Sequence, residues 1–519
     1  MAEVRNVVIG VLVVLVILLG ALAGYFAMQV GKGVVTTVTV TKTITVTQAV
    51  TPIPTLKKVT LSIEFGEPWK DLVMPVIEKY KEYMKTLGYD VDVKTKMIPY
   101  GQDFVAVISQ DFAAGTAGDV VIVDSFMIPS YAAAGYLYPL DDFVKTWDDW
   151  KAYPEAMKKI VSFKGRVYGV MIDTDVRMIW YRKDIFKIAG LPEEWQPRTW
   201  EDIVKAIKAL LEHSEEIKKK LGIDEFYPFY IPAGTKWGEA TTMQGFYMVL
   251  LGADKPPYNR LYDYEKGKWI CKSTALWRTF WFYIVIYNKL KAGPVAYNFA
   301  ADVWATHRKV FSEGKVAMDV GGSWEWGEGW GPEGIAPLKV CKERCGEDAK
   351  CYVECEREYI GFAKMPGWSG GAHGELPYVT ISGGWAVAVN ARTAEDPDKL
   401  KAALEFIKFV ASKENIARYC AKFGKVAPRI DAVEVPIYAE NRYLKAITEY
   451  LEFTDFRDAM PMYPKVSLII QKVTEMIVKG EITDATTALE KYCEMLKEEV
   501  GEENVIELPV ETTPPFSIP

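Results

Sequence analysis

Histidine is scarce in this chain of 519 residues. Only His213, His307 and His373 occur, and they lie far apart, with none of the spacings that metal ligands adopt. The sequence therefore argues against a histidine-based metal enzyme, and no motif in it indicates a cofactor. Lysine and arginine form no dense block and the formal net charge is only −7, which argues against nucleic acid as a partner.

Apolar and aromatic residues are abundant instead. Half of the residues are hydrophobic and a quarter are charged, which is the balance of a folded globular protein. A chain of this length is too long to fold around a single hydrophobic core, so we expect two lobes with additional segments. Most of the 16 Trp and 29 Tyr residues belong to the core, but such a supply of rings also suits a pocket that stacks on a polar molecule.

The first 33 residues contain a long apolar stretch. No charged residue occurs from residue 7 to residue 31, a run that exceeds the roughly 20 residues of a membrane-spanning helix. We interpret residues 1–33 as a single N-terminal membrane anchor. The alternative is a cleaved signal peptide. Ala21-Leu22-Ala23 offers a cleavage site, although the apolar region of such signals is usually only about 7–15 residues long.

A threonine-rich segment follows at residues 34–57. Thr36 is followed by a threonine–valine alternation from Thr37 to Thr41, and Pro52 and Pro54 close the segment. This pattern favours an extended backbone and cannot build a core, so we interpret it as a stalk, open to O-glycosylation, that holds a folded body away from the membrane. The alternative is a single strand that pairs with a neighbour. We expect the body to lie outside the cell.

Four of the seven cysteines lie close together, as Cys341, Cys345, Cys351 and Cys355. A separation of four residues places two cysteines on one face of a helix, and two such turns joined by a short loop can fold back antiparallel. We therefore expect a helical hairpin inserted at residues 338–358, with disulfides joining Cys341 to Cys355 and Cys345 to Cys351. A zinc site is the alternative, but disulfides suit an extracellular location better.

The other three cysteines are widely spaced. We expect Cys420 and Cys493 to pair, which leaves Cys271 as a free thiol. This pairing rests on the preference of extracellular cysteines for disulfides and not on their spacing. We expect no metal site among the seven.

The body opens with alternating strand and helix patterns. Residues 59–65, 91–98 and 119–123 have the composition of strands, and apolar residues at helical spacing predict helices at 68–87 and about 103–114. The βαβαβ order implies a parallel sheet covered by helices, and hence an α/β fold. In such sheets, ligands bind beyond the carboxyl ends of the strands.

Polar and aromatic side chains follow two of these strands. Glu67 and Trp69 come after the first strand, and Asp124, Ser125 and Phe126 come after the third. Because the carboxyl ends of parallel strands meet at one edge of a sheet, we expect these five side chains to contribute to a ligand site.

Four blocks of the sequence carry a family resemblance. They are 164–170 (KGRVYGV) with 180–186 (WYRKDIF), 189–191 and 197–200; 311–318 with Gly322-Ser323-Trp324; 382–389 (SGGWAVAV); and 480–489 (GEITDATTAL). In this order they resemble the family 1 extracellular solute-binding proteins of ABC transporters, which include maltose-binding proteins, over about residues 58–500. The anchor and stalk are similar to those of archaeal members, and the many Glu, Lys and Arg residues fit a thermophile.

The resemblance implies a two-lobed periplasmic-binding-protein-like fold with discontinuous α/β lobes, a hinge and a central ligand cleft. It places the first lobe at residues 58–173 plus 383–440 and the second at residues 174–382 plus 441–510, and it leaves residues 511–519 as a tail. The hinge then lies near residues 172–175 and 381–384. Closure about this hinge would bury a bound solute.

The resemblance also implies a function. Members of the family are receptors and not enzymes: they capture a small solute between the lobes and deliver it to permease subunits in the membrane. We expect a monomer that binds a sugar. The C–H faces of a sugar pack on aromatic rings and its hydroxyl groups need charged or amide partners, so the cleft should offer both.

The family pattern carries over to three positions of this chain. Asp175 lies where maltose-binding relatives place an acidic sugar ligand, Trp324 matches a ring that stacks on sugar, and Trp385 follows two glycines that let backbone approach the ligand. Val123 stands where those relatives have a tryptophan, which argues against maltose itself. The alternatives are a place in the core for each tryptophan and a cap of the hinge for Asp175.

Other functions stay open. The solute could be a polyamine, an anion or a metal chelate, and a polyamine would require an acidic cleft. An anchored glycoside hydrolase would also be rich in aromatic residues, but it would need two carboxylates about 5–10 Å apart, and no motif marks such a pair. A purely structural surface protein is the third alternative, and failure to bind any solute would favour it.

Overall fold

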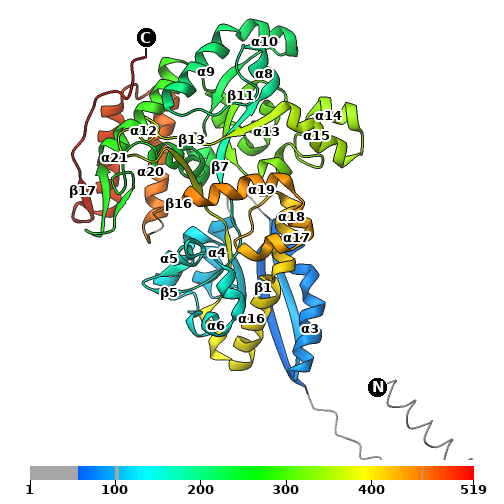
Figure 1. The fold of residues 1–519 in the computed structure, drawn as a ribbon. Coiled ribbons are helices and arrows are strands. Elements are labelled where there is room, and N and C mark those ends of the chain that lie inside the picture. Colours follow the sequence, from blue (N-terminus) through cyan, green and yellow to red (C-terminus); the bar gives the residue numbers. More distant parts are fainter. Residues whose placement is uncertain (1–55, 100–103, 459, 519) are drawn as a thin grey trace, which may run out of the picture. The chain divides into compact units, whose positions relative to one another are not determined.

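The computed structural model describes residues 56–99, 104–458 and 460–518 (Figure 1). By its contacts the chain divides into residues 1–54 and residues 55–519. The expected membrane anchor lies outside the described residues, as does the expected stalk except for its last two residues. No helix in the described part of the chain is both long enough and apolar enough to cross a membrane.

Five strands form the first sheet, in the order β2 (Tyr89–Ile98), β1 (Lys57–Gly66), β3 (Val120–Asp124), β15 (Trp385–Val389) and β6 (Val170–Asp173). β1 pairs in parallel with β2 and β3, whereas β15 runs antiparallel to β3 and β6. The three parallel strands expected from the sequence are confirmed. Residues 120–123 are completely buried, because a strand inside such a sheet is covered on both faces.

Proline interrupts the first helix that the sequence predicts. In place of one helix over residues 68–87, the chain forms η1 (Glu67–Trp69), α2 (Lys70–Val73), η2 (Met74–Val76) and α3 (Ile77–Thr86). Pro68 and Pro75 lie in the first turns of η1 and η2, since proline lacks the backbone N–H that a continuing helix requires. The second predicted helix is confirmed as α4 (Phe104–Ala114).

Short elements complete the surroundings of the first sheet. They are η3 (Ser125–Met127), α5 (Ile128–Ala133), α6 (Asp141–Thr146), η4 (Asp148–Ala152), α7 (Glu155–Ile160), β4 (Ser162–Phe163), β5 (Arg166–Val167), η10 (Ala391–Glu395), α16 (Pro397–Val410), α17 (Lys413–Phe423), η11 (Ile430–Glu434) and α18 (Pro436–Ala439). The longest of them, α16, begins with Pro397 directly after the cap Asp396, whose side chain accepts from two backbone N–H groups.

The second sheet has four strands, in the order β12 (Ile360–Ala363), β7 (Arg177–Arg182), β11 (Val316–Gly322) and β8 (Tyr227–Tyr230). β7 pairs antiparallel with β11 and β12, and β8 runs parallel to β11. β7 and β11 are buried along their whole length, so this sheet forms the centre of a second core.

Many helices and turns accompany the second sheet. They are α8 (Lys183–Ile188), α9 (Trp200–Glu212), α10 (Ser214–Leu221), η5 (Thr235–Trp237), η6 (Thr241–Phe246), α11 (Tyr247–Leu250), α12 (Thr274–Ile284), η7 (Val285–Lys289), η8 (Ala296–Phe299), α13 (Val303–Ser312), η9 (Glu325–Gly329), α20 (Tyr463–Val478), α21 (Ala485–Val500) and η13 (Glu502–Asn504). Helices α12, α20 and α21 pack on one another.

Two small sheets and a helical pair complete the fold. One sheet has the order β17 (Val505–Glu507), β10 (Lys268–Lys272) and β9 (Tyr262–Asp263), and the other has the order β13 (Met365–Pro366), β14 (Tyr378–Ser382) and β16 (Thr454–Phe456). α19 (Arg442–Thr448) and η12 (Glu449–Phe453) lead into β16.

Two α/β lobes are therefore present, as expected. The chain passes from β6 of the first sheet to β7 of the second through Thr174, and from β14 to β15 through Gly383 and Gly384. Both crossings fall in the segments expected to form the hinge. The lobe boundaries drawn from the sequence stay a prediction.

The cysteine-rich insertion forms the expected hairpin of two helices, α14 (Lys339–Cys345) and α15 (Ala349–Tyr359), which Figure 1 shows projecting beside α13. Disulfides join Cys341 to Cys355 and Cys345 to Cys351. This is the pairing that the helical spacing predicted, because each helix presents its two cysteines on one face.

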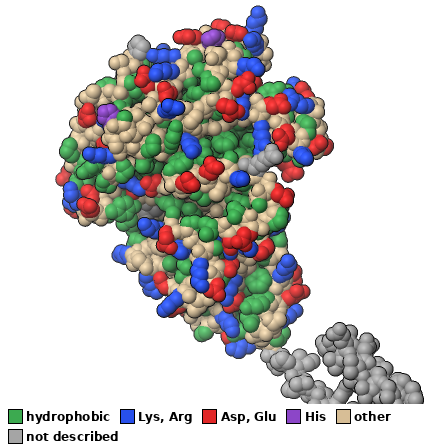
Figure 2. All heavy atoms as spheres, in the orientation of Figure 1, with side chains coloured by type: hydrophobic (Ala, Val, Ile, Leu, Met, Phe, Trp, Pro, Cys, Tyr) green, Lys and Arg blue, Asp and Glu red, His purple; other side chains and the backbone are tan. Residues whose placement is uncertain are grey.

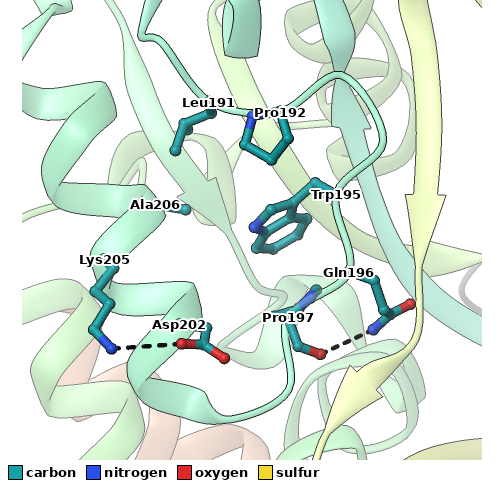
Figure 3. A pocket seen from close by; sticks show the side chains of 8 residues that line it. All are labelled: Leu191, Pro192, Trp195, Gln196, Pro197, Asp202, Lys205 and Ala206. Atoms are coloured by element: carbon teal, nitrogen blue, oxygen red, sulfur yellow. Dashed lines mark hydrogen bonds and ion pairs between the residues drawn. The ribbon is translucent and has the colours of Figure 1, made fainter.

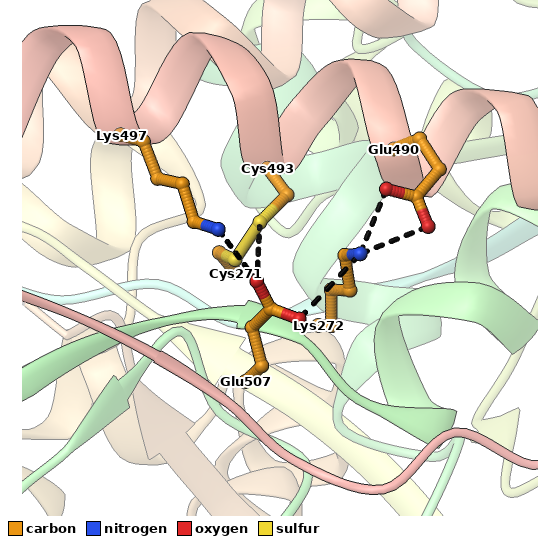
Figure 4. Close-up of a disulfide and its surroundings, with 6 residues drawn as sticks. All are labelled: Cys271, Lys272, Glu490, Cys493, Lys497 and Glu507. Carbon is orange, nitrogen blue, oxygen red and sulfur yellow. Dashed lines mark hydrogen bonds and ion pairs between the residues drawn. A yellow bond between two sulfur atoms is a disulfide. The ribbon is translucent and has the colours of Figure 1, made fainter. Parts of the chain in front are cut away.

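The predicted Cys420–Cys493 disulfide is wrong. Cys493 on α21 pairs with Cys271 on β10 (Figure 4), and Cys420 on α17 is a buried free cysteine. The reason is tertiary: α21 packs against β10, whereas α17 belongs to the elements around the first sheet. Around the Cys271–Cys493 disulfide, Glu507 on β17 accepts from Lys497, and Lys272 is within salt-bridge range of both Glu507 and Glu490.

The described part of the expected tail, residues 511–518, packs on α12. Glu511 pairs with Arg278 at 3.0 Å, and the ring of Phe516 lies 5.0 Å from that of Trp281. On the face drawn in Figure 2, acidic and basic side chains of the described residues are interspersed, which agrees with the small net charge.

Candidate functional site

The two crossings between the lobes are bonded to each other. Gly383 donates its backbone N–H to the Asp175 carboxylate at 2.8 Å, and Trp385 donates its backbone N–H to Asp173 at 3.1 Å. The hydroxyl of Thr174 donates to the carbonyl of Gly383 at 2.9 Å. The carboxylates of the first crossing thus hold the backbone of the second.

Gly384 is required at this junction. Its φ is +121°, and a Cβ placed on it would lie 2.3 Å from the carbonyl oxygen of Asp173. No L-residue with a side chain fits such an approach without moving backbone. The double glycine noticed in the sequence therefore lets the two crossing segments touch.

The carboxyl end of β3 carries Asp124, Ser125 and Phe126, the residues expected there. Asp124 lies 3.2 Å from Arg457, which also contacts Glu239 at 2.9 Å. Burial raises the pKa of Asp124 to about 6, although the charge of Arg457 acts in the opposite direction. The guanidinium of Arg457 therefore links an acid at the end of a first-sheet strand to an acid among the second-sheet elements.

Ser125 and Phe126 are both buried beside this ion pair. Ser125 donates its backbone N–H to the carbonyl of Gly384 at 3.0 Å, and its hydroxyl has no hydrogen-bond partner among the described residues. The Phe126 ring lies under Arg457, 4.7 Å from ring centre to guanidinium carbon. The end of β3 thus contacts both the hinge glycine and the bridging arginine.

Aromatic rings gather at the ends of β1 and β15. The rings of Trp69 and Trp385 are 4.1 Å apart, and Phe104 lies 5.7 and 5.5 Å from them. Trp69 is only 1% exposed, whereas Trp385 is partly accessible. Glu67 lies exposed at the start of η1, next to this cluster in sequence.

Lys425 contacts both this aromatic cluster and the hinge. Lys425 is 3.2 Å from the Asp173 carboxylate and 5.6 Å from the centre of the Trp69 ring. The indole N–H of Trp69 donates to the same carboxylate at 3.4 Å. Burial raises the pKa of Asp173, and Lys425 opposes that shift.

The second lobe contributes Trp324, two residues after the end of β11. Its ring is partly accessible, the guanidinium carbon of Arg177 lies 5.0 Å from the ring centre, and Trp304 is 6.3 Å away. The indole N–H of Trp324 donates to Glu325 at 2.8 Å. Trp324 thus donates to a buried carboxylate and lies next to a cation.

Among the described residues, the aspartates at this junction each have a cationic partner, whereas Glu67 at the rim has no ion pair. Asp124 pairs with Arg457, Asp173 with Lys425, and Asp175 with Arg177. Glu239 shares Arg457 with Asp124. Each of the three aspartates is therefore neutralised by a neighbouring cation where the lobes meet.

The three basic residues of these ion pairs, and one of the acids, were not predicted from the sequence. No recognised motif contains Arg177, Lys425, Arg457 or the acid Glu239. The last three are each more than 200 residues away from a partner in the chain. Only Arg177 had a usable signal, because it is two residues from Asp175 and extended backbone places such residues on the same side.

A separate pocket of 260 Å³ lies beside α9 (Figure 3). Trp195 and the prolines at 192 and 197 form its apolar wall, while Asp202 and Lys205 lie at its edge. Asp202 is already used as the capping partner of Thr199, and Gln196 donates to the carbonyls of Pro197 and Lys364. No residue predicted for the ligand site lines this pocket.

Known proteins share this sequence pattern. The family model described as bacterial extracellular solute-binding protein matches residues 68–340. The maltodextrin-binding protein of Bacillus subtilis is 23% identical over 308 residues, which are 58% of this chain and 64% of that protein. The first curated relatives, binding proteins of Brucella, are 24% identical over 140 residues, and the chain spans only 33% of their length.

Solved structures share the fold. The maltose-bound MalE3 protein of T. maritima superposes with a TM-score of 0.63 at 20% identity, and the match covers 85% of this chain and 99% of that one. The likeness shows the same two-lobed architecture. Because the family model matches more than half of the 519 residues, the chain belongs to the bacterial extracellular solute-binding protein family.

Proposed function

We propose that this protein is the extracellular receptor of an ABC importer, and that it captures a sugar between its lobes and delivers it to the permease. Family membership supports the receptor role. The names of similar proteins, a maltodextrin-binding protein and a maltose-bound protein, support a carbohydrate as the solute class. The single observation that carries the proposal is the meeting of aromatic rings and balanced ion pairs where the lobes adjoin.

The balance of charge favours an uncharged solute. A polyamine would need carboxylates without cationic partners, and an anion or an anionic metal chelate would need cations without acidic partners. At this junction Asp124, Asp173 and Asp175 each have a basic partner. Paired ions still offer lone pairs and N–H groups to hydroxyls, which is what a sugar requires.

Each predicted site residue receives a role in this proposal. The partly accessible rings of Trp324 and Trp385 stack on the sugar, and the buried ring of Trp69 supports Trp385. Asp124, Asp175 and Ser125 bind hydroxyl groups, while Phe126 holds Arg457 in place and Glu67 lies at the rim. Asp175 serves the hinge as well, because it accepts from Gly383.

Closure about the hinge completes the proposal. The first lobe, residues 58–173 and 383–440, turns against the second, residues 174–382 and 441–510, about the segments 172–175 and 381–384. The closed form buries the solute, and the permease distinguishes it from the open form by its shape. The receptor acts as a monomer without enzymatic activity, and residues 1–33 anchor it in the membrane of a thermophilic archaeon.

Thermal unfolding of the purified, ligand-stripped full-length chain tests the function against a panel of sugars, polyamines, anions and metal chelates. A solute at about 100 times its dissociation constant should stabilise the native state by roughly 2.7 kcal/mol. A shift with one sugar that is lost in Trp324→Ala and Trp385→Ala supports the proposal. A shift only with a charged solute would overturn the sugar, and release of reducing ends from an oligosaccharide would point to a hydrolase.

A further inference from the structure

A buried charged cluster lies behind the ring of Trp324. Its indole N–H donates to Oε1 of Glu325 at 2.8 Å. Glu325, which is completely buried, also accepts two hydrogen bonds from Arg308, at 2.6 and 3.1 Å. Bidentate charge-assisted bonds of this kind fix both partners in one geometry, so the acceptor offered to the indole is held in place.

His307 closes the other side of the cluster. Its two ring nitrogens lie 3.2 Å from Asp319 and 3.4 Å from Glu325, and it is 1% exposed. Burial alone would lower the pKa of His307, but Glu325 and Asp319 raise it to about 9. Burial alone would raise the pKa of Glu325, but Arg308 and His307 lower it to about 2. Glu325 is therefore an anion held by two cations at neutral pH.

One face of α13 supplies the cations and a neighbouring ring. Trp304, His307 and Arg308 are spaced at i, i+3 and i+4, so they share a side of the helix. Trp304 lies 6.3 Å from the ring of Trp324 and 5.6 Å from the guanidinium carbon of Arg308. The helix thus contacts Trp324 directly through a ring and indirectly through Glu325.

We propose that Glu325 is a positioning residue: held by Arg308 and His307, it fixes the orientation of the Trp324 ring. Buried ion pairs contribute little net stability, because desolvation offsets the attraction between the charges. Their geometric effect is more specific, since they leave the indole N–H a single acceptor in a fixed place. The consequence for solute binding rests on the proposed function, but the orientation of the ring does not.

Fluorine NMR of the full-length chain labelled with 5-fluorotryptophan tests the orientation without any solute. Loss of one resonance in Trp324→Phe assigns Trp324. In Glu325→Gln, an amide replaces the anion that holds Arg308, so the Trp324 resonance should move and broaden while those of Trp150 and Trp147 keep their positions. An unchanged Trp324 resonance would overturn the proposal. If Glu325→Gln fails to fold, Arg308→Lys, which keeps the charge but loses the bidentate fork, must give the same change.

A double-mutant cycle tests the effect on binding, with the sugar of the thermal-unfolding panel that gives the largest shift as the probe. Glu325→Gln should weaken binding by about fivefold when Trp324 is present and much less in the Trp324→Phe background, because the indole N–H is gone there. Equal weakening in both backgrounds would contradict a role through Trp324. If no sugar of the panel binds the parent chain, the carbohydrate proposal is overturned, while the NMR result still decides the positioning role.

Discussion

Arg457 stands between two acids, with Nη2 3.2 Å from Asp124 and Nη1 2.9 Å from Glu239. Asp124 ends a strand of the first sheet, whereas Glu239 lies between η5 and η6 beside the second. Arg457 is only 6% exposed, and Glu239 is further held by the hydroxyls of Tyr463 and Ser467. One desolvated cation therefore links acids of the two sheets, beside the hydrogen bonds of the hinge segments.

Replacing this cation should be costly. Arg457→Ala leaves Asp124 and Glu239, which are both only partly exposed, without their counter-ion, and removal of one partner from a buried pair destabilises a protein by about 3–5 kcal/mol. Urea unfolding measures the loss. Arg166→Ala is the control, because its pair with Asp141 is more than one-third exposed on both sides and should cost less than about 1 kcal/mol. Equal costs for the two variants would contradict the importance of the buried contact.

Asp124 should make stability depend on pH between about 4 and 6. Its folded-state pKa, about 6, lies above that of an unfolded aspartate, about 3.9. The contribution of this group to stability is therefore present below pH 4 and is lost as the pH rises through 6, by about 3 kcal/mol. Urea unfolding at several pH values should show this decline, and Asp124→Asn should remove it. If stability declined with pH in Asp124→Asn as steeply as in the parent chain, a group other than Asp124 would be responsible for the decline.

Gly384→Ala should damage the hinge. The added methyl group would lie 2.3 Å from the carbonyl oxygen of Asp173 at a φ of +121°, so backbone must move. We expect a loss of about 2–4 kcal/mol in the free energy of unfolding, together with weaker solute binding. Gly135→Ala is the matched control, since that glycine also has positive φ but no atom within 4 Å of the new Cβ, and it should cost only about 1 kcal/mol.

The Cys271–Cys493 disulfide should stabilise the fold more than the disulfide inside the hairpin does. It joins residues 222 apart, whereas Cys345 and Cys351 are 6 apart, and a longer closed loop restricts the unfolded chain more. Replacing Cys271 and Cys493 by serine should cost about 2–5 kcal/mol, measured by thermal unfolding without reductant. Replacing Cys345 and Cys351 in the same way should cost less, and the reverse order would contradict the chain-entropy argument.

Local patterns predicted much of the fold. Alternating strand and helix patterns gave the parallel strands β1, β2 and β3, and cysteines one helical turn apart gave both disulfides of the hairpin. These features depend on neighbours in the sequence, so periodicity reveals them. The continuous helix over 68–87 failed because the two prolines outweigh the apolar spacing there.

Contacts between residues far apart in the chain could not be predicted from the sequence. Cys271 meets Cys493 only because β10 packs against α21, and no spacing rule links positions 222 residues apart. The same holds for the bridge from Asp124 through Arg457 to Glu239, which joins three distant segments. A single sequence contains no signal for such contacts when neither partner belongs to a known motif.

The sequence by itself determined the α/β class, the family, and the choice of Trp324 and Trp385 as candidate sugar-stacking rings. Each of these follows from short-range periodicity or from motifs that lie in one stretch of chain. Only the tertiary structure decided the balance of charge between the lobes and the support of Trp324 by Glu325 and Arg308. Those properties depend on which charged side chains the fold places next to one another. A buried acid is stable as an anion only beside a cation, and that cation can come from any segment of the chain.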